Sequence, residues 1–145
     1  LIEPGRSIIG EAGVTLYKVG AIKDIPGVKK YVAIDGGMFD NPRYALYQSK
    51  YTPILANRAN EAPKEIVSIA GKCCESGDLI QEHVALARPV RGDILAVLTT
   101  GPYNYSMASN YNRLPRAPIV MLRGGNESYV AVRRESFADL CANDL

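Results

Sequence analysis

The sequence predicts a mostly β domain, a Greek-key barrel or sandwich with a few short helices. Seven short runs rich in Val, Ile, Leu and Tyr alternate with clusters of Pro, Gly, Asn and Asp, as expected for strands joined by turns. With 145 residues, of which 47% are hydrophobic and 22% charged, the chain suits one domain or a piece of a larger protein. In chain order the runs are Val14–Ile22, Tyr31–Asp35, Tyr51–Ala56, Glu65–Ala70, Asp93–Thr99, Ile119–Leu122 and Tyr129–Arg133.

Two short helices are expected among these strands. Asn41 can cap a helix that starts with proline, so Pro42–Tyr47 is predicted to form one or two turns. Apolar residues at helical spacing predict a second helix over Glu135–Ala142, with the acidic Glu135 in its first turn. Within that helix we interpret Cys141 as a packing residue rather than a redox group.

Composition and charge exclude several classes of protein. A formal net charge of +2 removes the electrostatic argument for a nucleic-acid-binding surface. No apolar run approaches the roughly 20 residues that span a bilayer and no signal peptide opens the chain, so we expect a cytoplasmic protein with no membrane partner. The single histidine, His83, excludes a multi-histidine metal site, and we interpret it as a solvated residue beside Glu82. The chain does not begin with methionine, so we expect it to be cut from a longer protein.

Two adjacent cysteines follow the fourth predicted strand. Cys73 and Cys74 are poorly placed for a mutual disulfide, and an odd number of cysteines without a secretory signal predicts reduced thiols. If the strand continues through Gly71, alternation places Cys73 on the core face and Cys74 on the more polar face. Because Glu75 follows at the strand end, Cys74 is a candidate proton donor or substrate contact. A buried cysteine before an ordinary polar turn explains the same residues without chemistry.

Two other groups suit the binding of an anion. Arg43 and Tyr47 stand at i and i+4 in the first predicted helix, so they share a face and can clamp a carboxylate or phosphate. Taken alone, Arg43 is also explained as an ordinary surface arginine. Near the start of the chain, Gly5 lets backbone amides approach a ligand closely, and Arg6 follows it directly.

The longest stretch without apolar periodicity is the segment Gly101–Pro118, which we call the Tyr/Asn loop. Loops of this length in a compact domain are usually functional or disordered, and tyrosine favours contact over disorder. We therefore predict a functional loop, with packing of the tyrosines onto the barrel as the alternative. Its aromatic and amide residues include Tyr103, Asn104, Tyr105, Asn110, Tyr111 and Asn112.

Four segments occur in this order: Glu3–Ser7, Asp35–Met38 with Asn41–Arg43, Cys74–Asp78, and Tyr103–Asn112. Together they resemble the C-terminal part of the pyridoxal-phosphate-dependent decarboxylases of the bacterial diaminopimelate type, over essentially the whole chain. A Cys-Glu pair is similar to the diaminopimelate members, whereas ornithine-type decarboxylases have Cys-Asp there. Two positions depart from the family pattern, namely Tyr44, where proline is common, and Pro102, where a small residue precedes the tyrosine.

The resemblance implies a two-part enzyme with pyridoxal 5'-phosphate as its cofactor. Residues 1–13 would end an N-terminal (β/α)8 barrel, which holds the cofactor and the Schiff-base lysine, and residues 14–145 would form the C-terminal β-domain. The implied reaction converts meso-diaminopimelate to L-lysine and carbon dioxide, the last step of lysine biosynthesis. The implied assembly is a homodimer with shared active sites.

The resemblance also implies which residues border the cofactor and the substrate. Glu3, Gly5, Arg6 and Tyr103 would lie beside the cofactor, and the last two would also reach the small-molecule substrate.

Further roles are implied for the distal end of the substrate. Arg43 and Tyr47 would bind this end. Cys74 would be the catalytic proton donor and Glu75 would bind the distal ammonium, both entering from the other subunit.

Two other interpretations stay open. A non-enzymatic β-domain can bind a protein partner through the Tyr/Asn loop, since tyrosine-rich loops make good contact surfaces. A related basic-amino-acid decarboxylase of the same fold is the second. In either decarboxylase we expect the chain alone to be inactive, because the Schiff-base lysine lies outside it.

Overall fold

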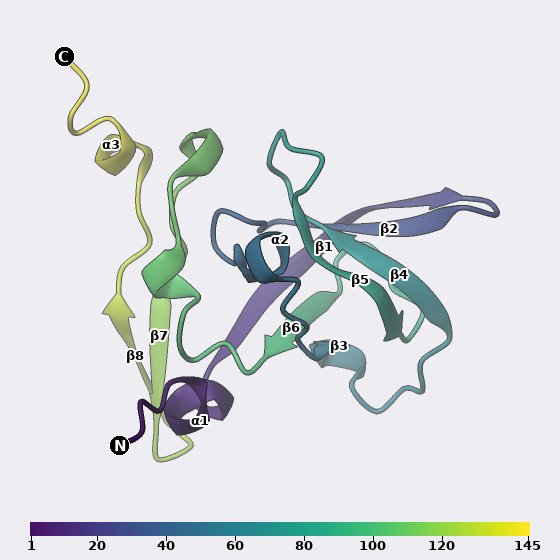
Figure 1. Cartoon of the computed structure of the whole chain (residues 1–145), viewed down its shortest axis with the longest axis horizontal. Coiled ribbons are helices and arrows are strands. Elements are labelled where there is room, and N and C mark those ends of the chain that lie inside the picture. Colours follow the sequence, from purple (N-terminus) through teal and green to yellow (C-terminus); the bar gives the residue numbers. More distant parts are fainter.

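The computed structural model describes residues 1–145, and its main feature is one six-stranded sheet (Figure 1). The strands are β1 (Val14–Ile25), β2 (Lys29–Ile34), β3 (Pro53–Leu55), β4 (Glu65–Ala70), β5 (Leu79–Leu86) and β6 (Ile94–Leu98). Their order across the sheet is β3-β6-β1-β2-β4-β5, and only the β2–β4 pair is parallel. The edge strands β3 and β5 also contact each other, so the sheet is a nearly closed barrel, as the sequence predicts.

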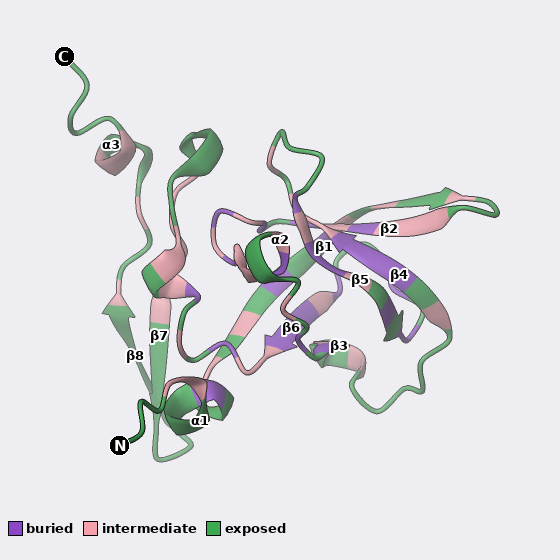
Figure 2. Cartoon of the chain, in the orientation of Figure 1, coloured by how far each residue is buried: buried purple, intermediate pink, exposed green.

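The interior of this barrel is filled by alternate side chains of the strands. Along β1 the inward positions Tyr17 and Val19 are buried and their neighbours are not, which is the period-2 pattern of a half-buried strand. On β4, which lies between β2 and β5, the successive residues Val67, Ser68 and Ile69 are all buried (Figure 2). The core cluster consists of Tyr17, Val19, Val32, Ile34, Tyr51, Leu55, Val67, Ile69, Ile80, Val84, Leu86, Ala87, Leu95 and Val97.

All seven runs read from the sequence correspond to strands, but strand β5 was not predicted. The residues Gln81, Glu82 and His83 interrupt its apolar pattern. Gln81 is nevertheless buried, because its side-chain oxygen accepts a hydrogen bond of 2.7 Å from the backbone N–H of Tyr51. His83 is exposed, as expected, and its φ of 54° marks a bulge where β5 loses register with β4.

The first predicted helix is present as α2 (Arg43–Tyr47), but the prediction of its cap was wrong. Pro42 occupies the N-cap position, and no side chain caps the helix. Asn41 is instead 1% exposed, and neither atom of its amide has a hydrogen-bond partner in the chain. Another short helix, α1 (Arg6–Ile9), precedes the first strand. Short 3-10 turns lie directly after α1, at η1 (Gly10–Ala12), and directly after β3, at η2 (Ala56–Arg58).

The second predicted helix is shorter than expected, at α3 (Phe137–Leu140). Ser136 caps it in a reciprocal capping box with Asp139, so Glu135 lies before the helix and not in its first turn. The prediction that Cys141 is a packing residue was also wrong. Cys141 follows the last helical residue and is exposed, because α3 lies apart from the barrel (Figure 1).

A separate hairpin completes the chain. Strands β7 (Ile119–Arg123) and β8 (Glu127–Val132) pair only with each other, and most of their residues are exposed (Figure 2). The Tyr/Asn loop connects the barrel to this hairpin and contains two 3-10 turns, η3 (Tyr105–Met107) and η4 (Tyr111–Arg113). None of the helices combines the length and the apolar character needed to cross a membrane.

Candidate functional site

Arg43 is the centre of the first group of candidate residues. The spacing prediction is confirmed, because the guanidinium carbon of Arg43 lies 5.1 Å from the centre of the Tyr47 ring on the same helix. The same carbon lies 5.2 Å from the centre of the Tyr103 ring, on the Tyr/Asn loop. One guanidinium N–H group also points to the sulfur of Met107, at 3.9 Å. Arg43 is thus held between two aromatic faces.

Tyr103 also lies against the turn at the start of the chain. A Cβ atom at Gly5 would overlap the Tyr103 hydroxyl, so only glycine permits this approach. Tyr103 has a φ of 66°, in the left-handed region that residues other than glycine rarely adopt. The two residues border a cleft of about 530 Å³. The cleft is lined by Pro4, Gly5, Ile8, Ile9, Gly101, Pro102, Tyr103, Tyr105 and Ser106.

A second arginine, Arg6, follows Gly5 in the chain and lines a separate cleft of about 410 Å³. Arg6 donates one hydrogen bond of 3.1 Å to the backbone carbonyl of Thr99 and another of 3.2 Å to the hydroxyl of Tyr51. Its guanidinium also lies over the Tyr51 ring, and the Tyr51 hydroxyl donates to the side-chain oxygen of Asn104 at 3.4 Å. Sequence reasoning missed Tyr51 and Asn104 as supports of Arg6, because the link between them is entirely tertiary.

Three polar side chains near this group have incomplete hydrogen bonding. Both amide atoms of Asn41, the Nε of Arg43 and the Nδ2 of Asn104 are buried and have no partner within the chain. Buried polar atoms are nearly always paired, because an unpaired one costs about 1–3 kcal/mol. This side of the barrel therefore holds several buried donors and acceptors that the chain itself leaves unpaired.

The second group of candidate residues lies on the turn between β4 and β5. Strand β4 ends at Ala70, so strand alternation does not reach the cysteines, yet the expected order holds: Cys73 is half-buried and Cys74 is exposed. Burial, with the nearby Asp78 carboxylate, raises the pKa of the Cys73 thiol to about 11. Glu75 is exposed, and its carboxylate accepts bonds from the backbone of Gly77 and the hydroxyl of Ser76.

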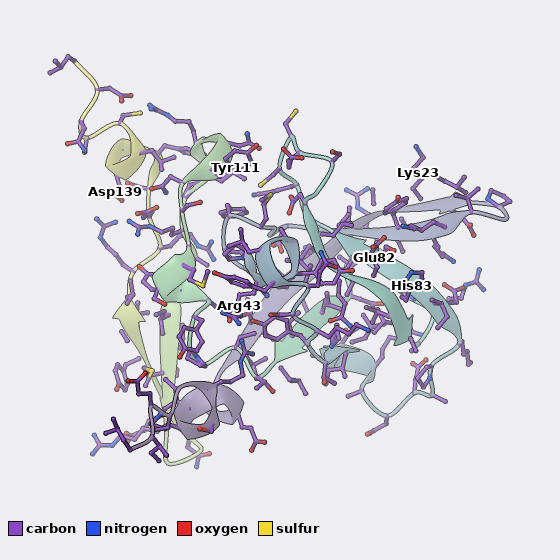
Figure 3. All side chains as sticks on the ribbon, in the orientation of Figure 1. Lys23, Arg43, Glu82, His83, Tyr111 and Asp139 are labelled. Carbon is purple, nitrogen blue, oxygen red and sulfur yellow. The ribbon has the colours of Figure 1, made fainter.

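The Tyr/Asn loop touches this turn at its far end. Partial burial and the Glu75 carboxylate raise the pKa of the Tyr111 hydroxyl. The side-chain oxygen of Asn112 accepts a hydrogen bond of 2.7 Å from the backbone N–H of Cys74. Figure 3 shows Arg43 near the middle of the molecule and Tyr111 farther along the loop.

The structure therefore brings the candidate residues together in two groups. Arg43, Tyr47, Tyr103, Gly5 and Arg6 form the first, which we call the arginine group.

Cys74, Glu75, Tyr111 and Asn112 form the second, which we call the thiol group. No hydrogen bond or ion pair joins the two groups. Glu3, expected beside the cofactor, is exposed and makes no side-chain hydrogen bond or ion pair.

Comparison with known proteins decides the family. The model of the pyridoxal-dependent decarboxylase C-terminal sheet domain matches residues 8–101. The chain belongs to this family. Diaminopimelate decarboxylases of Bacillus subtilis (strain 168) and Staphylococcus aureus (strain COL) are each 55% identical to this decarboxylase domain over 144 residues. A solved diaminopimelate decarboxylase from M. jannaschi is 40% identical, with a TM-score of 0.88.

The same comparisons show how much of a decarboxylase this domain represents. The alignments cover 99% of the chain in all three cases. They cover 33% and 34% of the two bacterial relatives and 32% of the solved chain, so the domain spans about a third of their length.

Proposed function

We propose that this domain acts in the cytoplasm as the C-terminal part of a pyridoxal-phosphate-dependent diaminopimelate decarboxylase, which converts meso-diaminopimelate to L-lysine and carbon dioxide. The observation that carries the proposal is Arg43, whose guanidinium lies against the rings of Tyr47 and Tyr103 and forms no ion pair within the chain. A cation oriented in this way suits the second carboxylate of an α,ε-diamino diacid. The name shared by the similar relatives supports the same substrate.

The residues beside the cleft fit one side of pyridoxal 5'-phosphate. An aromatic ring at Tyr103, a position at Gly5 with no room for a Cβ, and the cation of Arg6 nearby suit a flat, anionic group. Glu3, on the same turn, would border the cofactor from the outside. No lysine is among the lining residues, so the Schiff base would use a lysine of an N-terminal (β/α)8 barrel.

The boundary of that barrel is part of the proposal. Residues 1–13 would be its end, and residues 14–145 the β-domain. In support, α1 and η1 precede the first strand and bury only Gly10, so this segment contributes nothing to the core of the β-domain. Backbone bonds from Gly101 to Gly10 and from Thr100 to Gly13 fix it to the start of the Tyr/Asn loop.

The chemistry divides between cofactor and protein. Bound pyridoxal phosphate supplies an electron sink for the carbon that loses its carboxylate. Arg43 and Tyr47 bind the distal carboxylate, Arg6 holds the near end of the site, and Glu75 pairs with the distal ammonium. The bond to the carboxylate breaks, carbon dioxide leaves, and the Cys74 thiol gives a proton to the same carbon. A positioned acid contributes on the order of 10²–10⁴-fold to such a step.

The separation of the two groups supports a homodimer with shared sites. Within one chain no contact joins Arg43 to Cys74 or Glu75, although both groups are needed around one substrate. A second copy that presents its thiol group to the arginine group of the first would complete the site. This arrangement also explains why Cys74 and Glu75 are exposed here.

A purely protein-binding role for the Tyr/Asn loop has less support. The loop is tied back to its own domain through Asn104 and Asn112, and the relatives that match the whole chain are named as decarboxylases.

The test is the release of carbon dioxide by the full-length protein, loaded with pyridoxal phosphate. We expect meso-diaminopimelate to be decarboxylated at least 100-fold more efficiently than L-ornithine, L-arginine or L-lysine. These three amino acids lack the second carboxylate, and a site that pairs a polar group of its substrate rejects analogues without that group by up to roughly 10⁴–10⁵-fold. Equal or higher efficiency with a basic amino acid would instead assign the related activity.

A further inference from the structure

The turn that carries Cys74 and Glu75 has short-range backbone hydrogen bonds, from Glu75 to Cys73 at 2.8 Å and from Asp78 to Glu75 at 3.1 Å, but none of them uses the N–H of Cys74. The turn follows the end of β4, contains no regular element, and its residues from Cys74 to Gly77 are exposed. A side chain on such a turn can be placed accurately only if specific contacts fix the backbone. Two successive backbone N–H groups of the turn have such contacts.

The first contact comes from within the turn. The carboxylate of Asp78, which is 4% exposed, accepts a hydrogen bond of 2.7 Å from the N–H of Cys73 and one of 2.6 Å from the N–H of Met38. Gly37 and Gly71 pack against the same carboxylate so closely that a Cβ at either would collide with it. Asp78 therefore fixes the base of the turn to the segment that follows β2, but it accepts no hydrogen bond from the N–H of Cys74.

The second contact comes from a distant segment. The N–H of Cys74 donates to Oδ1 of Asn112 at 2.7 Å, although Asn112 lies on the Tyr/Asn loop. Asn112 has φ 55° and ψ 24°, the left-handed conformation that asparagine tolerates better than most residues. From this conformation the side chain of Asn112 reaches the turn.

The Asn112 side chain is itself presented from a fixed position. Asn110 accepts a backbone bond of 2.8 Å from Arg113, and its side-chain amide donates to the carbonyl of Leu114 at 3.1 Å and to Glu135 at 2.6 Å. The η4 turn is thus anchored by hydrogen bonds on both sides of Asn112. The bond from Asn112 to Cys74 therefore ties the thiol turn to a segment that is itself held in place.

We propose that Asn112 is a positioning residue for catalysis: its side-chain oxygen holds the backbone of Cys74 and thereby aims the thiol and the neighbouring Glu75 carboxylate. This inference rests on the proposed function, in which Cys74 delivers the proton. The Tyr/Asn loop then serves both groups of the site, with Tyr103 against Arg43 at one end and Asn112 against Cys74 at the other.

The test compares three variants of the full-length protein with the wild type. Asn112→Gly keeps the left-handed backbone without strain and removes the acceptor. Asn112→Asp keeps both the shape and the acceptor. Asn126→Gly is the matched control, because Asn126 lies in the exposed turn between β7 and β8 and makes no side-chain hydrogen bond.

Two measurements are made on each variant. Hydrogen–deuterium exchange reports the Cys74 amide directly, and we expect faster exchange in Asn112→Gly but protection in Asn112→Asp and in Asn126→Gly. Steady-state kinetics with meso-diaminopimelate should show kcat lowered by about 10–100-fold in Asn112→Gly, since misplacing a reacting group by 1 Å costs about that much. Asn112→Asp should recover most of the loss.

Several outcomes would overturn the inference. They are an unchanged kcat in a folded Asn112→Gly protein, an Asn112→Asp protein as impaired as Asn112→Gly, or exchange of the Cys74 amide that does not respond to either substitution. If Asn112→Gly does not fold, exchange of the Cys74 amide in Asn112→Asp decides, and an unprotected Cys74 amide in that variant overturns the inference. A wild-type protein without decarboxylase activity would instead refute the proposed function, and this inference with it.

Discussion

The guanidinium carbon of Arg43 lies 5.2 Å from the centre of the Tyr103 ring, and the ring of Tyr47 lies at a similar distance from it, 5.1 Å. The two tyrosines come from different segments, helix α2 and the Tyr/Asn loop. Contacts of a cation with an aromatic face contribute about 0.5–2 kcal/mol each, and they leave the N–H groups of the arginine available to a ligand. The arginine is therefore oriented before any substrate arrives.

From this arrangement we predict that Arg43→Lys in the full-length protein raises KM for meso-diaminopimelate by about 10-fold or more, with a smaller change in kcat. Lysine keeps the charge but loses the planar fork and the stacking on both rings. Steady-state kinetics measure the change. Arg91→Lys is the control, since Arg91 is exposed between β5 and β6 and forms no ion pair. Equal KM values for Arg43→Lys and the wild type would contradict the role of Arg43.

The arginine group shows where sequence reasoning reaches and where it ends. The pairing of Arg43 with Tyr47 follows from helical spacing, which is a local rule. The approach of Tyr103 to Arg43 and to Gly5 depends on how the Tyr/Asn loop folds back over the barrel, which no local pattern encodes. Resemblance to a family suggested that these residues share a site, but only the fold shows that they meet.

Asp40 gives a prediction for the dependence of stability on pH. Its carboxylate accepts a hydrogen bond of 2.5 Å from the Tyr17 hydroxyl, and burial raises its pKa to about 6. The unfolded chain ionises this carboxyl near pH 4, so between about pH 4 and 6 the folded state binds more protons than the unfolded state. The free energy of unfolding contributed by this group therefore falls as the pH rises through that window.

The measurement compares the wild-type chain with Asp40→Asn. Thermal melts from pH 4 to pH 7 should show the wild type losing roughly 2–3 kcal/mol relative to the variant, which cannot ionise at this position. Comparison of the two proteins cancels the titration of all other groups. Parallel melting curves across the range would contradict the raised pKa of Asp40.

Glu135 predicts the opposite behaviour in acid. Hydrogen bonds from the side chain and backbone of Arg116, together with one from Asn110, hold the pKa of Glu135 down to about 2. The unfolded chain ionises this group near 4.3, so the stabilisation is complete above that pH and is lost as the pH falls toward 2. Glu135→Gln should lower the melting temperature by several degrees at pH 7, and the gap should close near pH 2.

Its control is Glu127→Gln, because Glu127 is exposed on β8 and forms no ion pair. A gap that persisted unchanged at pH 2 would show that the glutamine disturbs packing rather than charge. Because Glu135 also binds Asn110, the same variant tests whether the C-terminal segment supports the Tyr/Asn loop.

The strands illustrate how far apolar patterns predict this fold. The bounds of β4 match the prediction residue for residue, since its mostly apolar run follows Pro63 and Lys64 and is ended by Gly71. Strand β5 was not predicted for two reasons. The polar side chain of Gln81 is buried, where it accepts a hydrogen bond from the N–H of Tyr51, and the bulge at His83 breaks the alternation of apolar residues. Burial of a paired polar group and a local bulge are tertiary features without a local signal.

The proposed sharing of sites predicts recovery of activity in hybrid dimers. Arg43→Ala and Cys74→Ala should each abolish most decarboxylase activity in the full-length protein. If each site combines the arginine group of one subunit with the thiol group of the other, a hybrid of the two variants contains one doubly damaged site and one intact site. Random exchange makes about half the dimers hybrids, so the mixture should regain up to roughly a quarter of wild-type activity.

The matched control mixes Cys74→Ala with Glu75→Gln. Both defects lie on the same turn, so every site of this hybrid carries one of them and no activity should return. Native mass spectrometry of differently tagged subunits verifies that exchange has taken place in both mixtures. If activity returns in the first mixture but not in the control mixture, Arg43 and Cys74 of one site must come from different chains. If subunits exchange in the first mixture but activity does not return, Arg43 and Cys74 of each site belong to one chain. The Tyr/Asn loop would then have to move to bring the arginine group and the thiol group together.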